Sequence, residues 1–147
     1  MFNAKDQVEM IKNAISEAAP EILEKYPVLL AYLYGSVATG NVHPFSDIDI
    51  AVYVQNLPAS GYLGLELSTS LEFDKKMPVG CHSEVRIVNN LPISITGVIV
   101  TEGILIYCKR ENARIDFETS VRKAYFDFLC VFRKYQNEYL DSAVSRP

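Results

Sequence analysis

The chain has 147 residues, a length that predicts a single domain (residues 1–147) large enough to bury a hydrophobic core. Hydrophobic residues make up 49% of the sequence and charged residues 22%, which is the composition of an ordinary soluble protein. The formal net charge of −4 disfavours direct binding of nucleic acid, because proteins that bind it usually present a basic surface.

The first segment is predicted to be an amphipathic helix, because apolar residues recur every three or four positions. These residues are Val8, Ile11, Ile15, Ala18 and Ile22. Pro20 is expected to break or end this helix early, and Pro27 to close the connection. Two continuous apolar runs, Val28 to Tyr34 and Ile48 to Val54, then predict strands that are covered on both faces. The connection between them has room for one helical turn near Ser36.

The middle of the chain predicts a further helix and two strands. Leucines at positions 63, 67 and 71 indicate a helix that ends near Met77–Pro78. Alternating polar and apolar residues from Ser83 to Val88 predict a third strand. Pro92 through Glu102 is predicted as a short helix, with a strand as the alternative because the segment is rich in β-branched residues. Gly103 to Cys108 predicts another strand.

The last segment is predicted to be a long helix with an aromatic stripe. Its members are Phe117, Val121, Tyr125, Phe128, Phe132, Tyr135 and Tyr139. The first half of the stripe is expected to pack on the sheet, whereas Phe132, Tyr135 and Tyr139 extend past the domain or pack on it as well. If they are exposed, they mark a partner surface. The alternation of helices with short strands predicts an α/β or α+β fold, with helices packed on a small mixed sheet.

Two aspartates, Asp47 and Asp49, stand at the start of the second apolar strand. Side chains two residues apart on a strand point to the same face, so both carboxylates are expected to project together. Paired carboxylates repel each other, and a shared divalent cation removes that repulsion. Hard oxygen ligands of this kind suit Mg²⁺ or Mn²⁺, which bind a few carboxylates together with substrate phosphates.

Gly35 and Ser36 follow the first strand and predict a phosphate-binding turn. A glycine lets the backbone approach a ligand closely, and a helical turn that starts at Ser36 presents free N–H groups to an anion. Combined with the aspartates, this arrangement would hold a nucleoside triphosphate with two metal ions for in-line displacement. Glu84 on the third strand is the preferred third carboxylate, to complete the metal site and take the proton of the attacking hydroxyl; Asp74 is the alternative.

The stretch GSVATGNVHPFSDID, from Gly35 to Asp49, resembles the Gly-Ser-x10-Asp-x-Asp signature of the DNA polymerase beta-like nucleotidyltransferase superfamily. The short chain, the turn NNLP and the segment RIDFETSVRKAYFDF resemble its minimal nucleotidyltransferase (MNT) domains, the antitoxin half of HEPN–MNT toxin–antitoxin modules. The resemblance covers Val28 to about Phe128. It departs from the family at Glu84, since the third acidic position is more usually aspartate.

The resemblance implies that Asp47, Asp49 and Glu84 bind two Mg²⁺ ions and carry catalysis, while Gly35 and Ser36 hold the triphosphate. Arg114 and Glu118 fall where related proteins carry a similar pair, although a surface ion pair on a helix is the other interpretation.

The activity that the resemblance implies is transfer of AMP from ATP to a hydroxyl, in the family a tyrosine, of a partner HEPN ribonuclease toxin. The chain and toxin would then form a hetero-oligomer. Two alternatives stay open. One is an antitoxin that neutralises its toxin by binding alone, and the other is nucleotidyl transfer to a small-molecule acceptor.

Location is expected to be cytoplasmic and without membrane contact. The three cysteines lack C-x-x-C spacing, which favours reduced thiols over disulfides or zinc. The N-terminal segment lacks the pattern of a secretory leader, and no apolar run is long enough to cross a bilayer.

Overall fold

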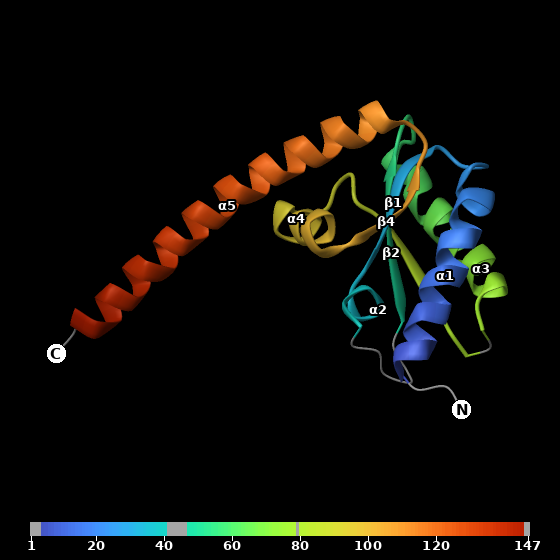
Figure 1. Ribbon diagram of the computed structural model, residues 1–147. Coiled ribbons are helices and arrows are strands. Elements are labelled where there is room, and N and C mark those ends of the chain that lie inside the picture. The colour runs from blue at the N-terminus through green and yellow to red at the C-terminus, as the bar shows by residue number, and fades with distance from the viewer. Residues whose placement is uncertain (1–3, 41–46, 79, 146–147) are drawn as a thin grey trace.

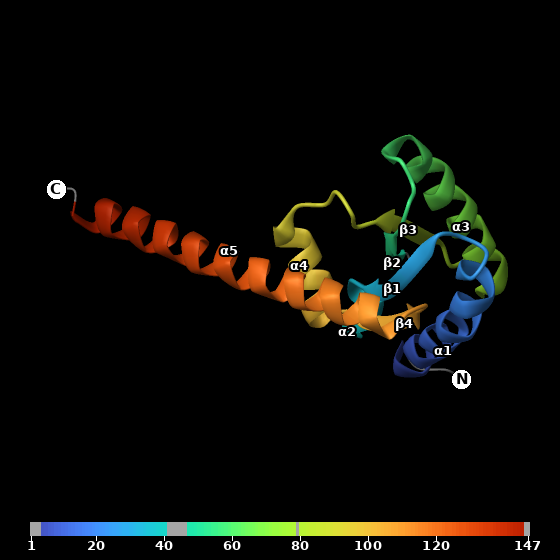
Figure 2. The same ribbon diagram turned by 90° about the horizontal axis from the view of Figure 1, so that it is seen from above.

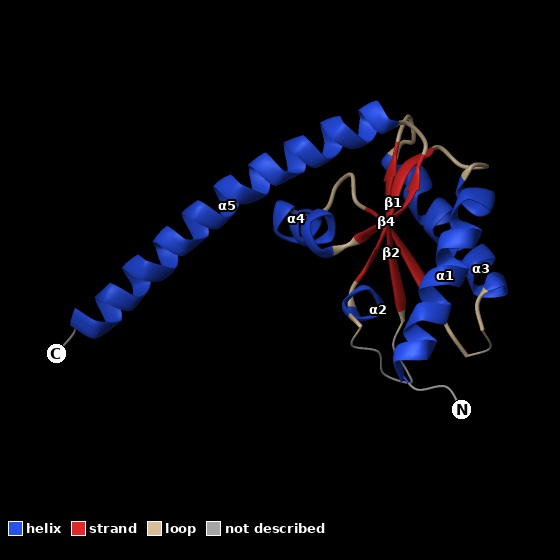
Figure 3. Ribbon diagram, in the orientation of Figure 1, coloured by secondary structure: helices blue, strands red, loops and turns tan. Residues whose placement is uncertain are grey.

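The computed structural model describes residues 4–40, 47–78 and 80–145. The helices are α1 (Ala4–Leu23), α2 (Ser36–Thr39), α3 (Tyr62–Lys76), α4 (Ile93–Glu102) and α5 (Glu111–Ser145), with one 3₁₀ turn, η1 (Ala59–Gly61). The strands are β1 (Val28–Tyr34), β2 (Ile48–Val54), β3 (Ser83–Ile87) and β4 (Ile104–Cys108). Figure 3 shows how these helices surround the strands.

The four strands form one mixed sheet in the order β3-β2-β1-β4. β2 runs parallel to β3, whereas β1 is antiparallel to both β2 and β4. The parallel pair needs a crossover connection, which α3 provides. The structure therefore confirms the predicted mixed sheet with helices packed on it.

Helices cover both faces of the sheet: α1 and α3 lie on one side, and α4 and the start of α5 lie on the other (Figures 1 and 2). Strand alternation divides β2 between these layers. Ile48, Ile50 and Val52 join the core beneath α1 and α3. Asp49 and Ala51 therefore face the α4/α5 side, where Ala51 joins the second apolar cluster. One face of the sheet thus carries both apolar packing and a carboxylate.

β3 is an edge strand whose outward N–H groups are bonded by side chains of α3. Ser83 N–H donates to Asp74 Oδ1 at 2.6 Å, Val85 N–H to Ser70 Oγ at 3.1 Å and Ile87 N–H to Glu66 Oε2 at 3.0 Å. An open strand edge is a template for unwanted pairing, and this covering removes it. Asp74 therefore supports the sheet edge.

Two features of the helices differ from what the sequence suggests. Pro20 lies inside α1, which continues to Leu23, so the prediction that Pro20 ends the helix early was wrong. Ile22 and Leu23 are 2% and 0% exposed, and their burial offsets the roughly 3 kcal/mol that an interior proline costs. The α3 helix is confirmed, but its leucines at 63, 67 and 71 are exposed, while Leu65, Thr69 and Phe73 face the core.

α3 is also tied to the end of α1. Lys25, just beyond α1, forms an ion pair with Glu72, and the Tyr26 hydroxyl donates to Glu72 Oε2 at 2.6 Å. The bond from Lys25, followed by that from Tyr26, holds the pKa of Glu72 below its ordinary value.

α5 begins on the sheet and then extends far beyond it (Figure 1). Its first turns bury Val121 and stack Phe117 on Tyr53 of β2 with ring centroids 4.3 Å apart. From Cys130 to Val144 every residue is exposed. None of the helices within the described ranges is long and apolar enough to span a membrane.

Candidate active site

Asp47 and Asp49 stand where the chain enters β2, on the face of the sheet that α4 and α5 cover only in part. Asp47 is exposed immediately before the strand, and Asp49 is half-buried as its second residue. Burial raises the pKa of the Asp49 carboxyl, and the carboxylates of Glu84 and Asp47 raise it further. Both of those carboxylates therefore lie close enough to Asp49 to repel its negative charge.

Glu84 is the register partner of Asp49 across the parallel β2–β3 pair. Registered residues of neighbouring strands project to the same face, so the two carboxylates stand side by side. The third acidic position that the sequence assigned to Glu84 thus falls beside Asp49. The alternative, Asp74, is bonded to the backbone of Ser83 at the outer edge of β3.

Two further residues belong to this cluster and were not predicted. Tyr34 is the register partner of Asp49 on the β1 side. Arg86 is two residues beyond Glu84 on β3, so it shares its face. Burial, and after it the Asp49 carboxylate, raise the pKa of Tyr34, whereas the Arg86 guanidinium opposes the shift at both Tyr34 and Asp49. Alternation along the third strand was a signal that places Arg86 on the face of Glu84, whereas the place of Tyr34 depends on the register between β1 and β2.

Gly35 brings the turn between β1 and α2 directly against Asp49. Its φ of 76° and ψ of −152° lie in a region that only glycine adopts readily. A Cβ atom at this position would overlap the Oδ2 atom of Asp49. Glycine is therefore required here both by the backbone conformation and by the neighbouring carboxylate.

The predicted helical turn after Gly35 is confirmed as α2, which starts at Ser36. Buried Val37 anchors it in the core, and the Thr39 hydroxyl donates to the carbonyl oxygens of Gly35 and Ser36 at 3.2 and 3.3 Å. Ser36 is half-buried at the start of the turn, close in sequence to the glycine that contacts Asp49. Residues 41–46, which complete the predicted phosphate-binding connection, lie outside the described residues.

Arg114 and Glu118 lie on α5 and pair with each other at 3.0 Å. Arg114 also pairs with Glu111, and Glu118 with Arg122 at 3.6 Å. Beneath them lies the buried Tyr32 hydroxyl. Burial, and after it the Glu118 carboxylate, raise the pKa of Tyr32. All three ion pairs lie within α5, and no described bond joins Arg114 or Glu118 to Asp49 or Glu84.

The carboxylates suit a hard divalent cation. Burial and, after it, the carboxylates of Glu84 and Asp47 raise the pKa of Asp49, and a bound cation would relieve the repulsion between these carboxylates. Within the described part of the chain, no three His, Cys, Asp or Glu side chains are arranged to enclose a metal ion by themselves. Magnesium sites commonly use one or two carboxylates and draw the remaining oxygen ligands from substrate phosphates and water. The residues present fit that pattern.

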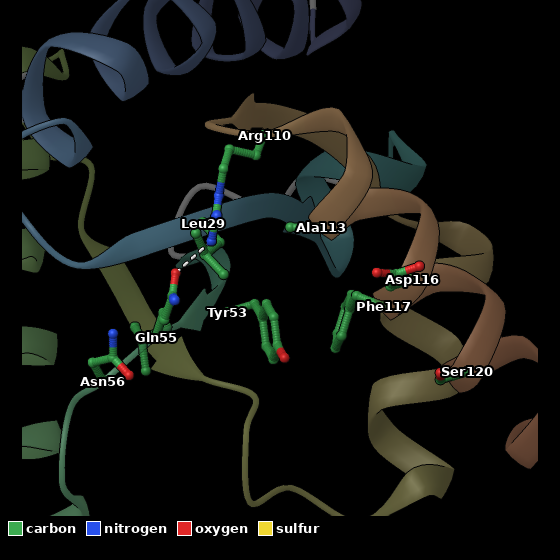
Figure 4. A pocket seen from close by; sticks show the side chains of 10 residues that line it. Leu29, Tyr53, Gln55, Asn56, Arg110, Ala113, Asp116, Phe117 and Ser120 are labelled. Atoms are coloured by element: carbon green, nitrogen blue, oxygen red, sulfur yellow. Dashed lines mark hydrogen bonds between the residues drawn. The ribbon is translucent and has the colours of Figure 1, made fainter.

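A separate pocket lies at the other end of the same sheet face (Figure 4). Its volume is about 520 Å³, and Tyr53 and Phe117 form one wall. Arg110 donates to Gln55 Oε1 at 2.6 Å across its rim. Gln55 follows the end of β2 whereas Asp49 stands near its start, so this pocket is distinct from the carboxylate cluster.

Comparison with known families places residues 17–112 in the family described as polymerase beta, nucleotidyltransferase. The match spans most of the chain and includes Asp47, Asp49, Glu84 and the Gly35–Ser36 turn. The chain therefore belongs to the polymerase beta nucleotidyltransferase family. A comparison with curated proteins finds no match.

Several solved structures share the fold. One is a chain of the tri-AMPylated Shewanella oneidensis HEPN toxin in complex with its MNT antitoxin, at 15% identity and a TM-score of 0.61, covering 88% of this chain and 98% of that one. Another is from a toxin–antitoxin complex with AMP-PNP, at 17% identity and a TM-score of 0.58, covering 91% and 98%. A third is from the toxin–antitoxin MntA-HepT, at 14% identity and a TM-score of 0.57, covering 90% and 99%. At these identities the likeness establishes the MNT fold.

Proposed function

We propose that this protein is a Mg²⁺-dependent antitoxin. It transfers AMP from ATP to the hydroxyl group of a tyrosine on a partner HEPN toxin. The observation that carries the proposal is the registered pair Asp49 and Glu84, which faces the glycine-only turn at Gly35. In a chain of the polymerase beta nucleotidyltransferase family, this arrangement supports phosphate chemistry at the start of β2.

In the proposed reaction the acceptor hydroxyl oxygen attacks the α-phosphorus of ATP in line. A new oxygen–phosphorus bond forms, the bond between the α-phosphorus and its bridging oxygen to the β-phosphate breaks, and pyrophosphate leaves. Glu84 takes the hydroxyl proton, because it is exposed and stands on the neighbouring strand as the register partner of Asp49. Mg²⁺ held by Asp47, Asp49 and Glu84 would neutralise charge on the phosphate oxygens.

The remaining residues of the site bind and orient the nucleotide. The Gly35 backbone and the start of α2 at Ser36 are proposed to approach the triphosphate, since N–H groups at a helix start are unpaired within the helix. Arg86 supplies a positive charge on the same face as Glu84 and reduces the repulsion at Asp49. It is therefore a positioning residue for the Asp49 carboxylate.

The nature of the acceptor is proposed from the structural neighbours. One neighbouring structure is the complex of a tri-AMPylated HEPN toxin with an MNT antitoxin, and another is a toxin–antitoxin complex with AMP-PNP. A toxin of this type is therefore the partner to test.

Intact-mass measurement of the partner toxin tests the proposal. Incubation with ATP, Mg²⁺ and the wild-type chain should add whole AMP units to the toxin. The double variant Asp47→Asn/Asp49→Asn should add none, because each substitution removes the negative charge of a carboxylate and keeps the size of the side chain. A Ser120→Ala variant, on α5 at the edge of the separate pocket, serves as the control and should transfer normally.

Neutralisation by binding alone is the second candidate, and the exposed second half of α5 favours it. It predicts that the Asp47→Asn/Asp49→Asn variant inhibits the toxin as well as the wild type and that the mass of the toxin never changes. That pair of results would overturn AMP transfer as the mechanism of neutralisation.

A further inference from the structure

The aromatic stripe of α5 begins as an internal helix contact. The ring of Tyr125 lies so close to Gly97 of α4 that a Cβ on this glycine would overlap it. Arg122, one turn earlier, donates to the Val100 carbonyl oxygen at 3.4 Å. At this point α5 packs an aromatic side chain against a small residue of a neighbouring helix.

The same stripe continues beyond the domain without a covering helix. Tyr125, Phe128 and Phe132 stack in sequence, with centroids 6.3 and 5.8 Å apart. Farther along, Phe132, Tyr135 and Tyr139 are 48%, 67% and 75% exposed. We call residues 126–144 the free half of α5. It extends away from the domain in both views (Figures 1 and 2).

The apolar face of the free half is broad. At about 100° per residue, Leu129, Val131 and Leu140 flank the aromatic stripe, so apolar residues cover about half of the helix circumference. The opposite face gathers charged and amide side chains. They are Asp127, Arg133, Lys134, Asn137, Glu138 and Asp141; Phe126 and Val144 also fall on this face, and Gln136 falls on the apolar one.

The size of these side chains argues against pairing of two copies of α5. In a two-stranded coiled coil the helix axes are 8–10 Å apart, and the seam favours β-branched residues and leucine. Successive rings at Phe128, Phe132, Tyr135 and Tyr139 are too bulky for that spacing. A membrane surface is also disfavoured, because the polar face carries three acidic and two basic residues instead of a basic stripe.

A wide face of rings instead fits a groove between two helices. We propose that the free half of α5 inserts into an apolar groove between two helices of the toxin partner, where small residues receive its rings as Gly97 receives Tyr125. The identity of the partner rests on the proposed function, whereas the surface and its helical occupant rest on the geometry of α5.

Binding of the full-length chain to the toxin, measured without ATP, tests the proposal. The variant Phe132→Ala/Tyr135→Ala/Tyr139→Ala should weaken binding by on the order of 100-fold or more, since buried aromatic anchors dominate interfaces of this kind. The matched control Lys134→Ala/Asn137→Ala/Asp141→Ala changes the opposite face of the same helix and should bind within twofold of the wild type. Alanine favours helix in both variants, and circular dichroism should show equal helix content.

Several outcomes would overturn the docking proposal. One is that the wild type does not bind the toxin, and another is that the aromatic variant binds it within threefold of the wild type. A third is that binding is lost only when the exposed leucines at positions 63, 67 and 71 of α3 become alanine. A fourth is a dimer of the chain alone that the aromatic variant turns into a monomer, which would make a second copy the occupant.

The failure of the proposed transfer looks different. In that case the complex forms and depends on the aromatic residues, but the toxin gains no AMP with Mg²⁺ and ATP. Conversely, normal AMP transfer by an aromatic variant that also binds normally would refute docking and leave the proposed function intact.

Discussion

Replacing Gly35 by alanine adds one methyl group at the point where the β1–α2 turn meets Asp49. The backbone there has φ 76° and ψ −152°, which an L-residue with a side chain rarely adopts. The new Cβ would also overlap Asp49 Oδ2. Either the turn changes its conformation or the carboxylate moves, and both changes act on the same site.

The magnitudes follow from these two effects. Holding a residue other than glycine in this region costs on the order of 1–3 kcal/mol of folding free energy. A displacement of about 1 Å in a reacting group commonly costs on the order of 100-fold in rate. We therefore expect Gly35→Ala to lower the free energy of unfolding by about 1–3 kcal/mol and AMP transfer by at least 100-fold.

Gly40→Ala provides the matched control. Gly40 also has a positive φ, 83°, at the end of α2, but an added Cβ meets no atom of the described residues within 4 Å. It should cost about 1–2 kcal/mol of stability and change transfer only a few-fold. Urea denaturation and initial rates of AMP transfer measure the two quantities. A Gly35→Ala protein that transfers AMP within threefold of the wild type would refute the assigned contact between Gly35 and Asp49.

Three further substitutions have defined outcomes. Glu72→Gln should cost about 1 kcal/mol at pH 7, mostly through the tyrosine hydrogen bond because Lys25 is largely exposed. Because folding lowers the pKa of Glu72, its carboxylate stabilises the protein fully above the ordinary pKa of 4.5. The difference in free energy of unfolding between the wild type and Glu72→Gln, measured by urea denaturation, should therefore vanish as the pH falls through the folded pKa. Arg86→Gln removes a charge that lowers the pKa of Asp49, so the acid limb of the pH–rate profile for AMP transfer should move to higher pH; an unchanged profile would contradict the assigned role. Gly64→Ala, in the first turn of α3 with open space around the new methyl group, should raise the free energy of unfolding by roughly 0.5 kcal/mol in urea denaturation.

The sequence predicts where the helices and strands lie along the chain better than it predicts which strands pair and in what register. Continuous apolar runs predicted β1 and β2 with the observed bounds, because both strands are covered on two faces. The sequence also placed Glu84 on the third strand. It did not contain the register that sets Glu84 opposite Asp49, since strand pairing is decided by tertiary packing.

Local rules also failed where tertiary packing prevailed. Pro20 does not end α1, because the residues after it are buried. Tyr34 and Arg86 belong to no motif, and the pairing of three strands places them beside Asp49. The aromatic stripe of α5 was predicted in full, whereas the point at which it leaves α4 depends on where the neighbouring helix ends.

β3 and α3 can form a row of hydrogen bonds because the rise of four helical residues nearly equals the rise of two strand residues. Four residues of helix rise about 6.0 Å and two residues of strand about 6.6 Å. Acceptors at every fourth position of α3 can therefore meet donors at every second position of β3, as Glu66, Ser70 and Asp74 do. The chain lengths of glutamate, serine and aspartate absorb the mismatch of about half an ångström per step.

The hydrogen bonds between α3 and β3 therefore fix the position of β3 along the edge of the sheet. Moving β3 by one residue would turn its three bonded N–H groups toward β2 and leave the α3 acceptors facing the wrong atoms. The position of Glu84 opposite Asp49 thus depends on α3, which bonds to the edge of β3 that faces away from β2. Through its hydrogen bond to the Val85 N–H group, Ser70 helps to place the carboxylate of Glu84 in the site.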